Sequence, residues 1–482
     1  MTEYNRLNIT EISEKLRDRE ISAQELTRLC LDNIEKSDLN ALNTLCAERA
    51  MRAAERADER LSRGESGALL GVPVIVKDNI CMDGVRTTCS SKILENYIPP
   101  YDATVVKKLD AAGAVILGKS NMDEFAMGSS NETSYFGKVK NPVNPEYVPG
   151  GSSGGSAASV GASLAFASLG SDTGGSIRQP ASVCGIVGLK PTYGTVSRYG
   201  LIAFGSSLDQ IGPFTRSVRD SALMMNVLAG HDPLESTSFV REYPDFTKSI
   251  RGSVKGLKLG VPKEYFIEGT DPEVRAAVEK TIAFYEAEGA ELVEVSLPLT
   301  DVGLAVYYII ACAEAASNLS RFDGVKYGYR AKDFDNLVDL YVRSRTEGFG
   351  AEVKRRIMLG NYVLSSGYYD AYYLKALKVR TLVKEDCAKA FEKCDLLISP
   401  TSPTTAFKFG EKSKDPLTMY MSDVFTVAAN IAGLPAISIP CGKSAKGLPI
   451  GVQLMGPAFS EGEIFNAAEY YESREGAKWI TR

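Results

Sequence analysis

Stretches in which apolar residues recur with a helical period alternate along this chain with short runs of β-branched residues. Such alternation is typical of an α/β protein. We predict a single large α/β domain with a central mixed β-sheet covered by helices on both faces. The predicted helices are 104–112, 215–228, 272–288 and, in two pieces, 352–392. The predicted strands are 72–76, 114–117, 185–189, 258–261, 292–295, 396–399, 436–439 and 451–454.

The N-terminal part has a different pattern, because residues 8–63 look helical throughout. Ser22 and Glu25 have the spacing of a capping box, in which each side chain satisfies a backbone N–H group at a helix start. We therefore expect a helical segment over 1–65 that packs on the core, followed by one continuous domain over 66–482. The segment that the sequence most clearly marks as a surface loop is 231–256, but it is not clearly a domain boundary.

Composition excludes several classes of protein. The 482 residues carry 44% hydrophobic and 24% charged residues, which is ordinary for a globular chain. A net charge of −5 gives no electrostatic reason for direct nucleic-acid binding. No apolar run approaches the roughly 18 residues needed to span a bilayer, and the first residues lack the features of a secretory signal. We expect a cytoplasmic protein without a membrane partner.

The nine cysteines are scattered and include no Cys-x-x-Cys pair, and the chain has a single histidine, His231. Common zinc sites need more histidine or paired cysteines. We therefore expect reduced thiols, mostly in the core, and no metal site.

Two runs rich in glycine and serine, 149–156 and 172–178, suggest serine chemistry. A serine hydroxyl is a poor nucleophile until a base takes its proton, and that base is usually histidine. With His231 alone available, lysine is the candidate base. Lys77 ends the apolar stretch 71–76, where a strand could present a buried amine to a loop.

Two other motif matches do not fit their contexts. Residues 113–120, which include Lys119, have the spacing of a phosphate-binding loop, but the loop positions hold the β-branched core residues of a strand. Residues 150–154 match the nucleophile elbow of α/β-hydrolases, but three prolines precede them and the required histidine would be His231, in a turn-like segment. We interpret the first as helix, turn and strand, and His231 as a surface residue.

The order and spacing of Lys77, the run 150–156 and the run 172–181, with Ser152 and Ser176 lying 24 residues apart, closely resemble the amidase signature family. The resemblance continues through 185–192, 194–200 and 207–213 and covers most of the chain. Within that family, 230–238 and 353–360 are similar to the glutamine-hydrolysing A subunits of aspartyl/glutamyl-tRNA amidotransferases. The resemblance implies the single-domain fold of that family.

The resemblance implies a catalytic triad. Ser176 would attack the carbonyl carbon of a carboxamide, Ser152, preceded by a cis peptide bond, would relay the proton, and Lys77 would act first as base and then as acid. For this the amine must be neutral, whereas a lysine of ordinary pKa is almost wholly charged at neutral pH. Burial without a carboxylate partner would lower the pKa, and Asp78 need not interfere because adjacent strand residues point to opposite faces.

Backbone N–H groups could stabilise the oxyanion of the tetrahedral intermediate, since two glycines permit close approach. The expected oxyanion hole comprises Thr173, Gly174, Gly175 and Ser176. An α-amino acid amide also needs a cation for its carboxylate and an anion for its ammonium group. By resemblance, Arg356 and Asp423 fill these roles and Tyr307 contributes a hydroxyl.

The resemblance as a whole implies a glutaminase that supplies ammonia for transamidation of Glu-tRNA(Gln), Asp-tRNA(Asn) or both. This chain would bind glutamine and need no cofactor of its own. It would work in a heterotrimer with a B subunit, which uses ATP and Mg²⁺ and binds the misacylated tRNA, and a small C subunit. Two alternatives stay open: a stand-alone amidase acting on another carboxamide, and a noncatalytic scaffold subunit.

Overall fold

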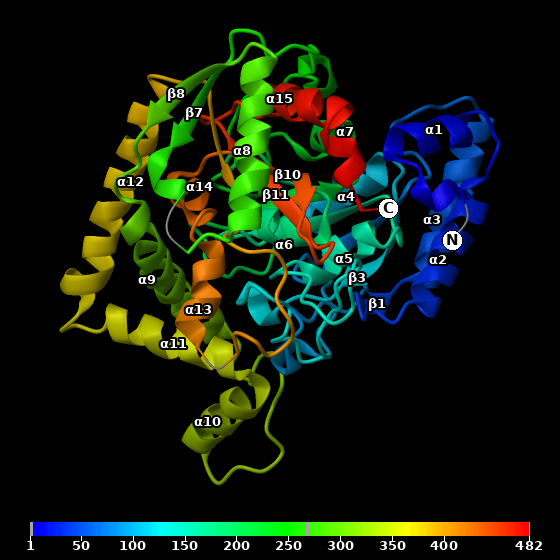
Figure 1. Ribbon diagram of the computed structural model, residues 1–482. Helices are drawn as coiled ribbons and strands as arrows, with labels where there is room; N and C mark the ends of the chain where they lie inside the picture. Colours follow the sequence, from blue (N-terminus) through cyan, green and yellow to red (C-terminus); the bar gives the residue numbers. More distant parts are fainter. Residues whose placement is uncertain (1–2, 267–268, 414, 482) are drawn as a thin grey trace.

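The computed structural model describes residues 3–266, 269–413 and 415–481, and its strands form one 11-stranded sheet at the centre of the molecule (Figure 1). The strand order is β1-β3-β2-β4-β6-β5-β10-β11-β9-β7-β8. The strands are β1 (Leu42–Leu45), β2 (Pro73–Lys77), β3 (Val115–Ser120), β4 (Ala167–Asp172), β5 (Val187–Lys190), β6 (Gln210–Thr215), β7 (Lys258–Pro262), β8 (Glu291–Val295), β9 (Leu396–Pro400), β10 (Ala436–Lys443) and β11 (Pro449–Met455).

The sheet is mixed. Parallel pairing joins β3, β2 and β4 in one half and β9, β7 and β8 in the other. Antiparallel pairing joins the strands between these halves and adds β1 at one edge. Strands β2 to β6, β9 and β11 are buried at every position, which requires cover on both faces.

Helices supply this cover. The α-helices are α1 (Ile9–Arg17), α2 (Ala23–Lys36), α3 (Ala47–Ser62), α4 (Thr104–Ala111), α5 (Gly154–Gly161), α6 (Arg178–Cys184), α7 (Val218–Leu228), α8 (Pro272–Ala287), α9 (Thr300–Asn318), α10 (Leu337–Gly348), α11 (Ala351–Leu364), α12 (Lys375–Phe391), α13 (Pro416–Tyr420), α14 (Val427–Ala432) and α15 (Glu461–Arg474).

Short 3₁₀ turns and one π-helical segment connect these elements. The 3₁₀ turns are η1 (Glu3–Arg6), η2 (Lys92–Leu94), η3 (Glu124–Ala126), η4 (Phe246–Ser249), η5 (Lys263–Tyr265), η6 (Leu319–Arg321), η8 (Met421–Asp423) and η9 (Gly476–Trp479). The π-helical segment is η7 (Tyr369–Leu374).

Two apolar layers sandwich the sheet. On one face a large cluster joins it to α1–α4, α7, α8 and α15. On the other face α5 packs against β2, β4 and β6, α6 packs against β5, β10 and β11, and α12 and α14 pack against β9–β11. Helices α9 and α11 pack on each other outside this second layer, and α10 projects from the body (Figure 1). The predicted single-domain α/β fold with a covered mixed sheet is confirmed.

All eight predicted strands are present, but β1, β4 and β6 were not predicted. The helical prediction over 8–63 is wrong at Leu42–Leu45, because these residues pair with β3 at the sheet edge. Strand β4 is rich in small and polar residues, and β6 contains Gly212 and Pro213, so local β-propensity is weak in both. Pairing with neighbours decides their conformation. The division of the chain at residue 65 stays a prediction.

One helical stretch in the described part of the chain, Thr300–Arg321, is long and apolar enough to cross a membrane by length and composition, contrary to the expectation that no apolar run approaches this length. Its most apolar window is 56% buried inside the protein. It packs against α11, α12 and α14, as a core helix does. All nine cysteines are buried free thiols.

Candidate active site

Strand β2 ends in Lys77, whose side chain is fully buried. Its Nζ lies 2.8 Å from Ser152 Oγ, 2.7 Å from Ser153 Oγ, and 3.0 and 3.3 Å from the Oγ and main-chain O of Ser171. A charged ammonium group at this place can only donate hydrogen bonds, whereas a neutral amine has a lone pair that can accept a proton from a hydroxyl. The 2.8 Å contact with Ser152 therefore suits a base that acts through Ser152 when the amine is neutral.

The environment of Lys77 favours this neutral form. Burial lowers the pKa of Lys77 to about 7, although Asp123, Asp172 and Asp209 pull it upward. The neighbouring Asp78 points away, as expected, and lies 3.7 Å from Lys119 on the other side. The amine therefore has no direct carboxylate partner within the residues that the structure describes.

Ser152 is held in a tight turn that leads into α5. The Gly151–Ser152 peptide bond is cis, as the resemblance implies. The main-chain O of Ser152 accepts a hydrogen bond from Asp123 N at 3.0 Å. A Cβ atom at Gly151 would lie 2.0 Å from Asp123 Oδ2, so only glycine fits beside this carboxylate.

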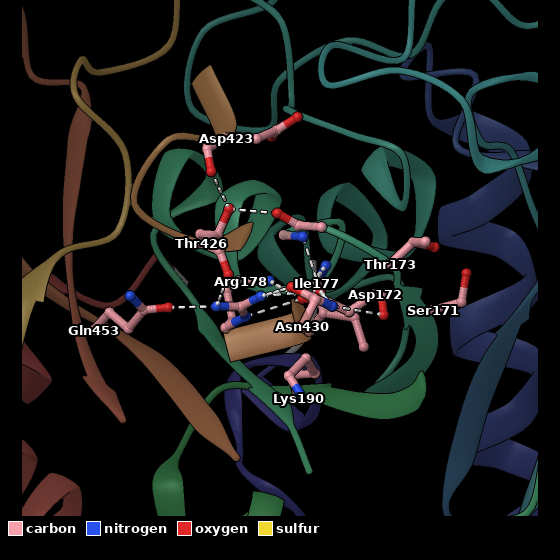
Figure 2. Close-up of polar contacts among 12 residues, drawn as sticks. Ser171, Asp172, Thr173, Ile177, Arg178, Lys190, Asp423, Thr426, Asn430 and Gln453 are labelled. Atoms are coloured by element: carbon pink, nitrogen blue, oxygen red, sulfur yellow. Dashed lines mark hydrogen bonds and ion pairs between the residues drawn. The ribbon is translucent and has the colours of Figure 1, made fainter. Parts of the chain in front are cut away.

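The second serine run forms a turn between β4 and α6 that is organised around the carboxylate of Asp172 (Figure 2). Asp172 accepts hydrogen bonds from Gly175 N at 2.8 Å and Ile177 N at 3.1 Å. Arg178 donates from Nη2 and Nε at 3.0 and 3.1 Å. Burial alone would raise the pKa of Asp172, but the Arg178 guanidinium lowers it to about 2. The turn thus encloses a fixed anion.

Ser176 stands at the tip of this turn and is 7% exposed. In the described part of the chain no hydrogen bond joins its hydroxyl to that of Ser152. Of the four expected oxyanion donors, the Gly175 N–H group is already engaged by Asp172. The N–H groups of Thr173, Gly174 and Ser176 have no partner among the described residues, which leaves three for a substrate oxygen.

Arg356 on α11 is 2% exposed, and its guanidinium is fixed in orientation. Its Nε donates to Glu352 Oε1 at 2.8 Å, and the rings of Tyr308, Tyr420 and Phe204 surround it at 5.1, 5.4 and 5.5 Å. No described residue hydrogen-bonds its Nη1 or Nη2. These two atoms have the fork geometry that suits a carboxylate.

Asp423 is buried and accepts hydrogen bonds from Ser129 Oγ at 2.7 Å and Tyr308 Oη at 3.5 Å. Burial raises the pKa of Asp423 to about 7, against the opposing effect of Arg356. Tyr307 packs its ring against Gly174, where a Cβ atom would lie 2.5 Å from Tyr307 Cζ. Burial raises the pKa of Tyr307 as well.

A cavity of about 260 Å³ adjoins Arg356. Its lining includes Ser129, Glu352, Arg356, Lys412 and Tyr420. The sequence pattern did not indicate three residues that contact Arg356 or Asp423, namely Ser129, Tyr308 and Tyr420. The i, i+4 spacing of Glu352 and Arg356 on a predicted helix was an available signal, since such residues are neighbours on one helix face. Nothing local marks the tyrosines, because they meet Arg356 only in the folded chain.

The two rejected motifs have the structures that were expected of them. Lys119 is buried in β3 and donates to Thr87 Oγ1 at 2.8 Å, so no phosphate loop forms there. His231 is exposed in the connection after α7. Among the described residues, no group of three or more His, Cys, Asp or Glu side chains is arranged to hold a metal ion.

Comparison with known proteins gives consistent results. A family model described as "Amidase" matches residues 25–465. The A subunit of glutamyl-tRNA(Gln) amidotransferase from Caldanaerobacter subterraneus subsp. tengcongensis is 59% identical over 97% of this chain and 96% of its own length. The crystal structure of the corresponding protein from Thermotoga maritima, which bears the same name, has a TM-score of 0.82 and 43% identity, over 98% of this chain and 96% of that one. Peptide amidase from Stenotrophomonas maltophilia has a TM-score of 0.83 and 29% identity, over 98% and 97%.

Proposed function

Because the chain belongs to the amidase family, we propose that it is the glutamine-hydrolysing subunit of a tRNA-dependent amidotransferase. The observation that carries the proposal is the buried Lys77 amine, with a pKa of about 7, at 2.8 Å from the Ser152 hydroxyl. The relatives at 59% and 43% identity are named as A subunits of glutamyl-tRNA(Gln) amidotransferase, which supports Glu-tRNA(Gln) as the acceptor. The proposal adds glutamine as the substrate and Asp-tRNA(Asn) as an alternative or second acceptor.

The reaction proceeds through an acyl-enzyme. Ser176 Oγ forms a bond with the side-chain carbonyl carbon of glutamine, while Ser152 takes its proton and passes its own to neutral Lys77. The carbonyl oxygen becomes an oxyanion, stabilised by the N–H groups of Thr173, Gly174 and Ser176. The carbon–nitrogen bond then breaks, and the proton returns from Lys77 through Ser152 to the nitrogen, which leaves as ammonia.

Water completes the cycle. Lys77 and Ser152 remove a proton from a water molecule, whose oxygen attacks the ester carbon on Ser176. The ester bond breaks, the proton returns to Ser176 Oγ, and glutamate is released. Each turnover thus consumes one glutamine and one water and yields one glutamate and one ammonia.

Glutamine is recognised at its α-carbon end. The free Nη1 and Nη2 atoms of Arg356 bind the carboxylate, and ionised Asp423 binds the ammonium group. Tyr307, which lies against Gly174, contributes its hydroxyl beside the reacting group. Burial makes each of these charged contacts stronger than it would be in water.

The full reaction needs partners. A B subunit uses ATP and Mg²⁺ and holds the misacylated tRNA, a small C subunit completes the heterotrimer, and the complex works in the cytoplasm. Co-expression with candidate partners, followed by assay with glutamine, ATP and misacylated tRNA, tests this. Partner-stimulated glutamine turnover supports the proposal, whereas turnover of other carboxamides alone indicates a stand-alone amidase, and an inactive chain within an active complex indicates a scaffold.

Replacing Arg356 by Ala should raise the KM for glutamine by about 100-fold, because a buried charge-assisted contact to the carboxylate is lost. Hydrolysis of propionamide, a small neutral amide without that carboxylate, should change by less than about threefold. Ammonia release under steady-state conditions measures both. Arg343→Ala on the exposed face of α10 is the control. Equal losses with both substrates would contradict the role of Arg356.

The pH dependence of kcat/KM follows from two groups with a pKa of about 7. Lys77 acts without its proton and Asp423 binds when ionised, so activity falls as the pH drops through about 7. Below the pKa values, kcat/KM for propionamide, which needs only Lys77, should fall about tenfold for each pH unit. For glutamine, which needs both groups, kcat/KM should fall by up to about 100-fold for each pH unit. Initial rates between about pH 5.5 and 8 test this, and profiles that rise toward acid would contradict it.

A further inference from the structure

The peptide unit between Gly174 and Gly175 is fixed at both ends. Its N–H group donates to Asp172 Oδ1 at 2.8 Å, and its carbonyl accepts a hydrogen bond from Thr426 Oγ1 at 2.6 Å. Thr426 is fully buried and lies 252 residues further along the chain. Its hydroxyl has one proton, and the other carbonyl in reach, that of Asp423, is more distant at 3.0 Å.

This restraint matters because the peptide is flanked by two glycines, which could otherwise rotate freely. Gly175 has a φ of +142°, and a Cβ atom there would lie 2.3 Å from Thr426 Oγ1. The neighbouring N–H groups are those of Gly174 and Ser176, both proposed oxyanion donors. Each of these N–H groups belongs to a peptide that shares a Cα atom with the fixed peptide, so fixing that peptide restricts the backbone angles that direct both donors. Loss of this restraint would affect the transition state, in which the oxyanion forms, more than the ground state.

Thr426 is itself held firmly (Figure 2). Its main-chain O accepts from Arg178 Nη1 at 3.0 Å, and Arg178 Nη2 donates to Asn430 Oδ1 at 2.6 Å. Asn430 Nδ2 closes the network by donating to Asp172 Oδ1 at 2.8 Å. The start of α14 and the turn after β4 are therefore joined as one rigid unit.

The same segment leads to the proposed ammonium site. Thr426 N donates to the main-chain O of Asp423 at 3.0 Å. Residues 423–430 thus contact the turn that carries Ser176 and also present the carboxylate that would bind the substrate. A change in the position of this segment would therefore move both the turn that carries Ser176 and the carboxylate of Asp423.

We propose that Thr426 is a positioning residue for amide hydrolysis, whose hydroxyl locks the Gly174–Gly175 peptide so that the adjacent N–H groups stay directed at the developing oxyanion. This inference rests on the proposed function. Thr426 does not touch the reacting atoms but acts through the turn.

Thr426→Val keeps the shape of the side chain and removes its donor. We expect kcat for glutamine and for propionamide to fall about 10- to 100-fold, which does not exceed the effect of removing a whole oxyanion donor. The KM for glutamine should stay within about threefold of the wild-type value. Thr426→Ser, which restores the hydroxyl, should recover kcat to within about threefold. The matched control is Thr281→Val on α8, where an equally buried hydroxyl donates to Ala277 O at 3.0 Å.

Inhibitor binding separates this role from a structural one. An alkyl boronic acid forms a tetrahedral anionic adduct with a serine nucleophile, so its affinity for Thr426→Val should fall by about the factor lost in kcat. The dissociation constant of glutamate, a planar carboxylate product, should be unchanged.

Two results would overturn the inference. The first is an unchanged kcat in Thr426→Val. The second is a loss of boronate affinity in Thr426→Val that is matched by the loss of glutamate affinity, accompanied by a lower melting temperature and not restored in Thr426→Ser. Wild-type enzyme is assayed first in the assembled complex. Absence of glutamine turnover there contradicts the proposed function, whereas an active wild type with an equally active Thr426→Val contradicts only the role of Thr426.

Discussion

Ser176→Ala should lower kcat/KM for glutamine by about 10⁴- to 10⁶-fold, because it removes the proposed nucleophile, the atom that would form the acyl-enzyme. The variant should fold normally, since the described structure shows no hydrogen bond of the Ser176 hydroxyl that the substitution would break. It should still bind glutamine with a dissociation constant close to the wild-type KM. Ammonia release and isothermal titration measure the two quantities.

Ser182→Ala on α6, six residues further along and also buried, is the matched control and should retain activity within about threefold. A Ser176→Ala enzyme that keeps a tenth or more of wild-type turnover would mean that another group is the nucleophile. Loss of turnover together with loss of the folded state would instead contradict the expectation that this hydroxyl is dispensable for folding.

Lys77→Met should lower kcat by about 10³- to 10⁴-fold, the contribution of a positioned general acid and base. The comparison variant is Lys190→Met, because Lys190 is also fully buried and burial also lowers its pKa to about 7. Among the residues that the structure describes, its Nζ donates only to Pro191 O, at 3.0 Å, and to none of the serines. We expect Lys190→Met to keep kcat within about tenfold. Similar losses in both variants would indicate a packing effect rather than catalysis.

Lys77 should also make stability depend on pH. The pKa of Lys77 is about 7 in the folded chain, whereas an ordinary lysine, as in the unfolded chain, has a pKa of 10.5. Between these two values the unfolded chain binds a proton at Lys77 that the folded chain does not. The free energy of unfolding of wild type, relative to Lys77→Met, should therefore rise with pH by up to about 1.4 kcal/mol per unit from about 7 toward 10.5. Urea denaturation of both proteins at about pH 7, 8 and 9 measures the difference.

Much of the candidate site could be predicted from the sequence because its chemistry lies in local patterns. An apolar strand that ends in Lys77, two runs of glycine and serine, and a lone histidine together indicate serine chemistry with a lysine base. The apolar runs likewise predicted the buried strands. These signals are local and require no knowledge of which elements pair.

The remainder depends on contacts between distant parts of the chain. Strand β6 has weak local β-propensity because of Gly212 and Pro213, yet it is paired on both edges in the sheet. Thr426 meets Gly174 across 252 residues, and Tyr420 meets Arg356 from a separate helix. The hydrogen bond from Gly175 N to Asp172 could not be predicted either, because it forms only when the turn is folded.

Rapid acid quenching of the complex during glutamine turnover, followed by peptide mapping by mass spectrometry, tests the proposed acyl-enzyme most directly. We expect one γ-glutamyl group in ester linkage to Ser176, absent from Ser176→Ala and reduced in Lys77→Met. A γ-glutamyl group on another residue, or continued turnover with Ser176 unmodified throughout, would contradict this proposal.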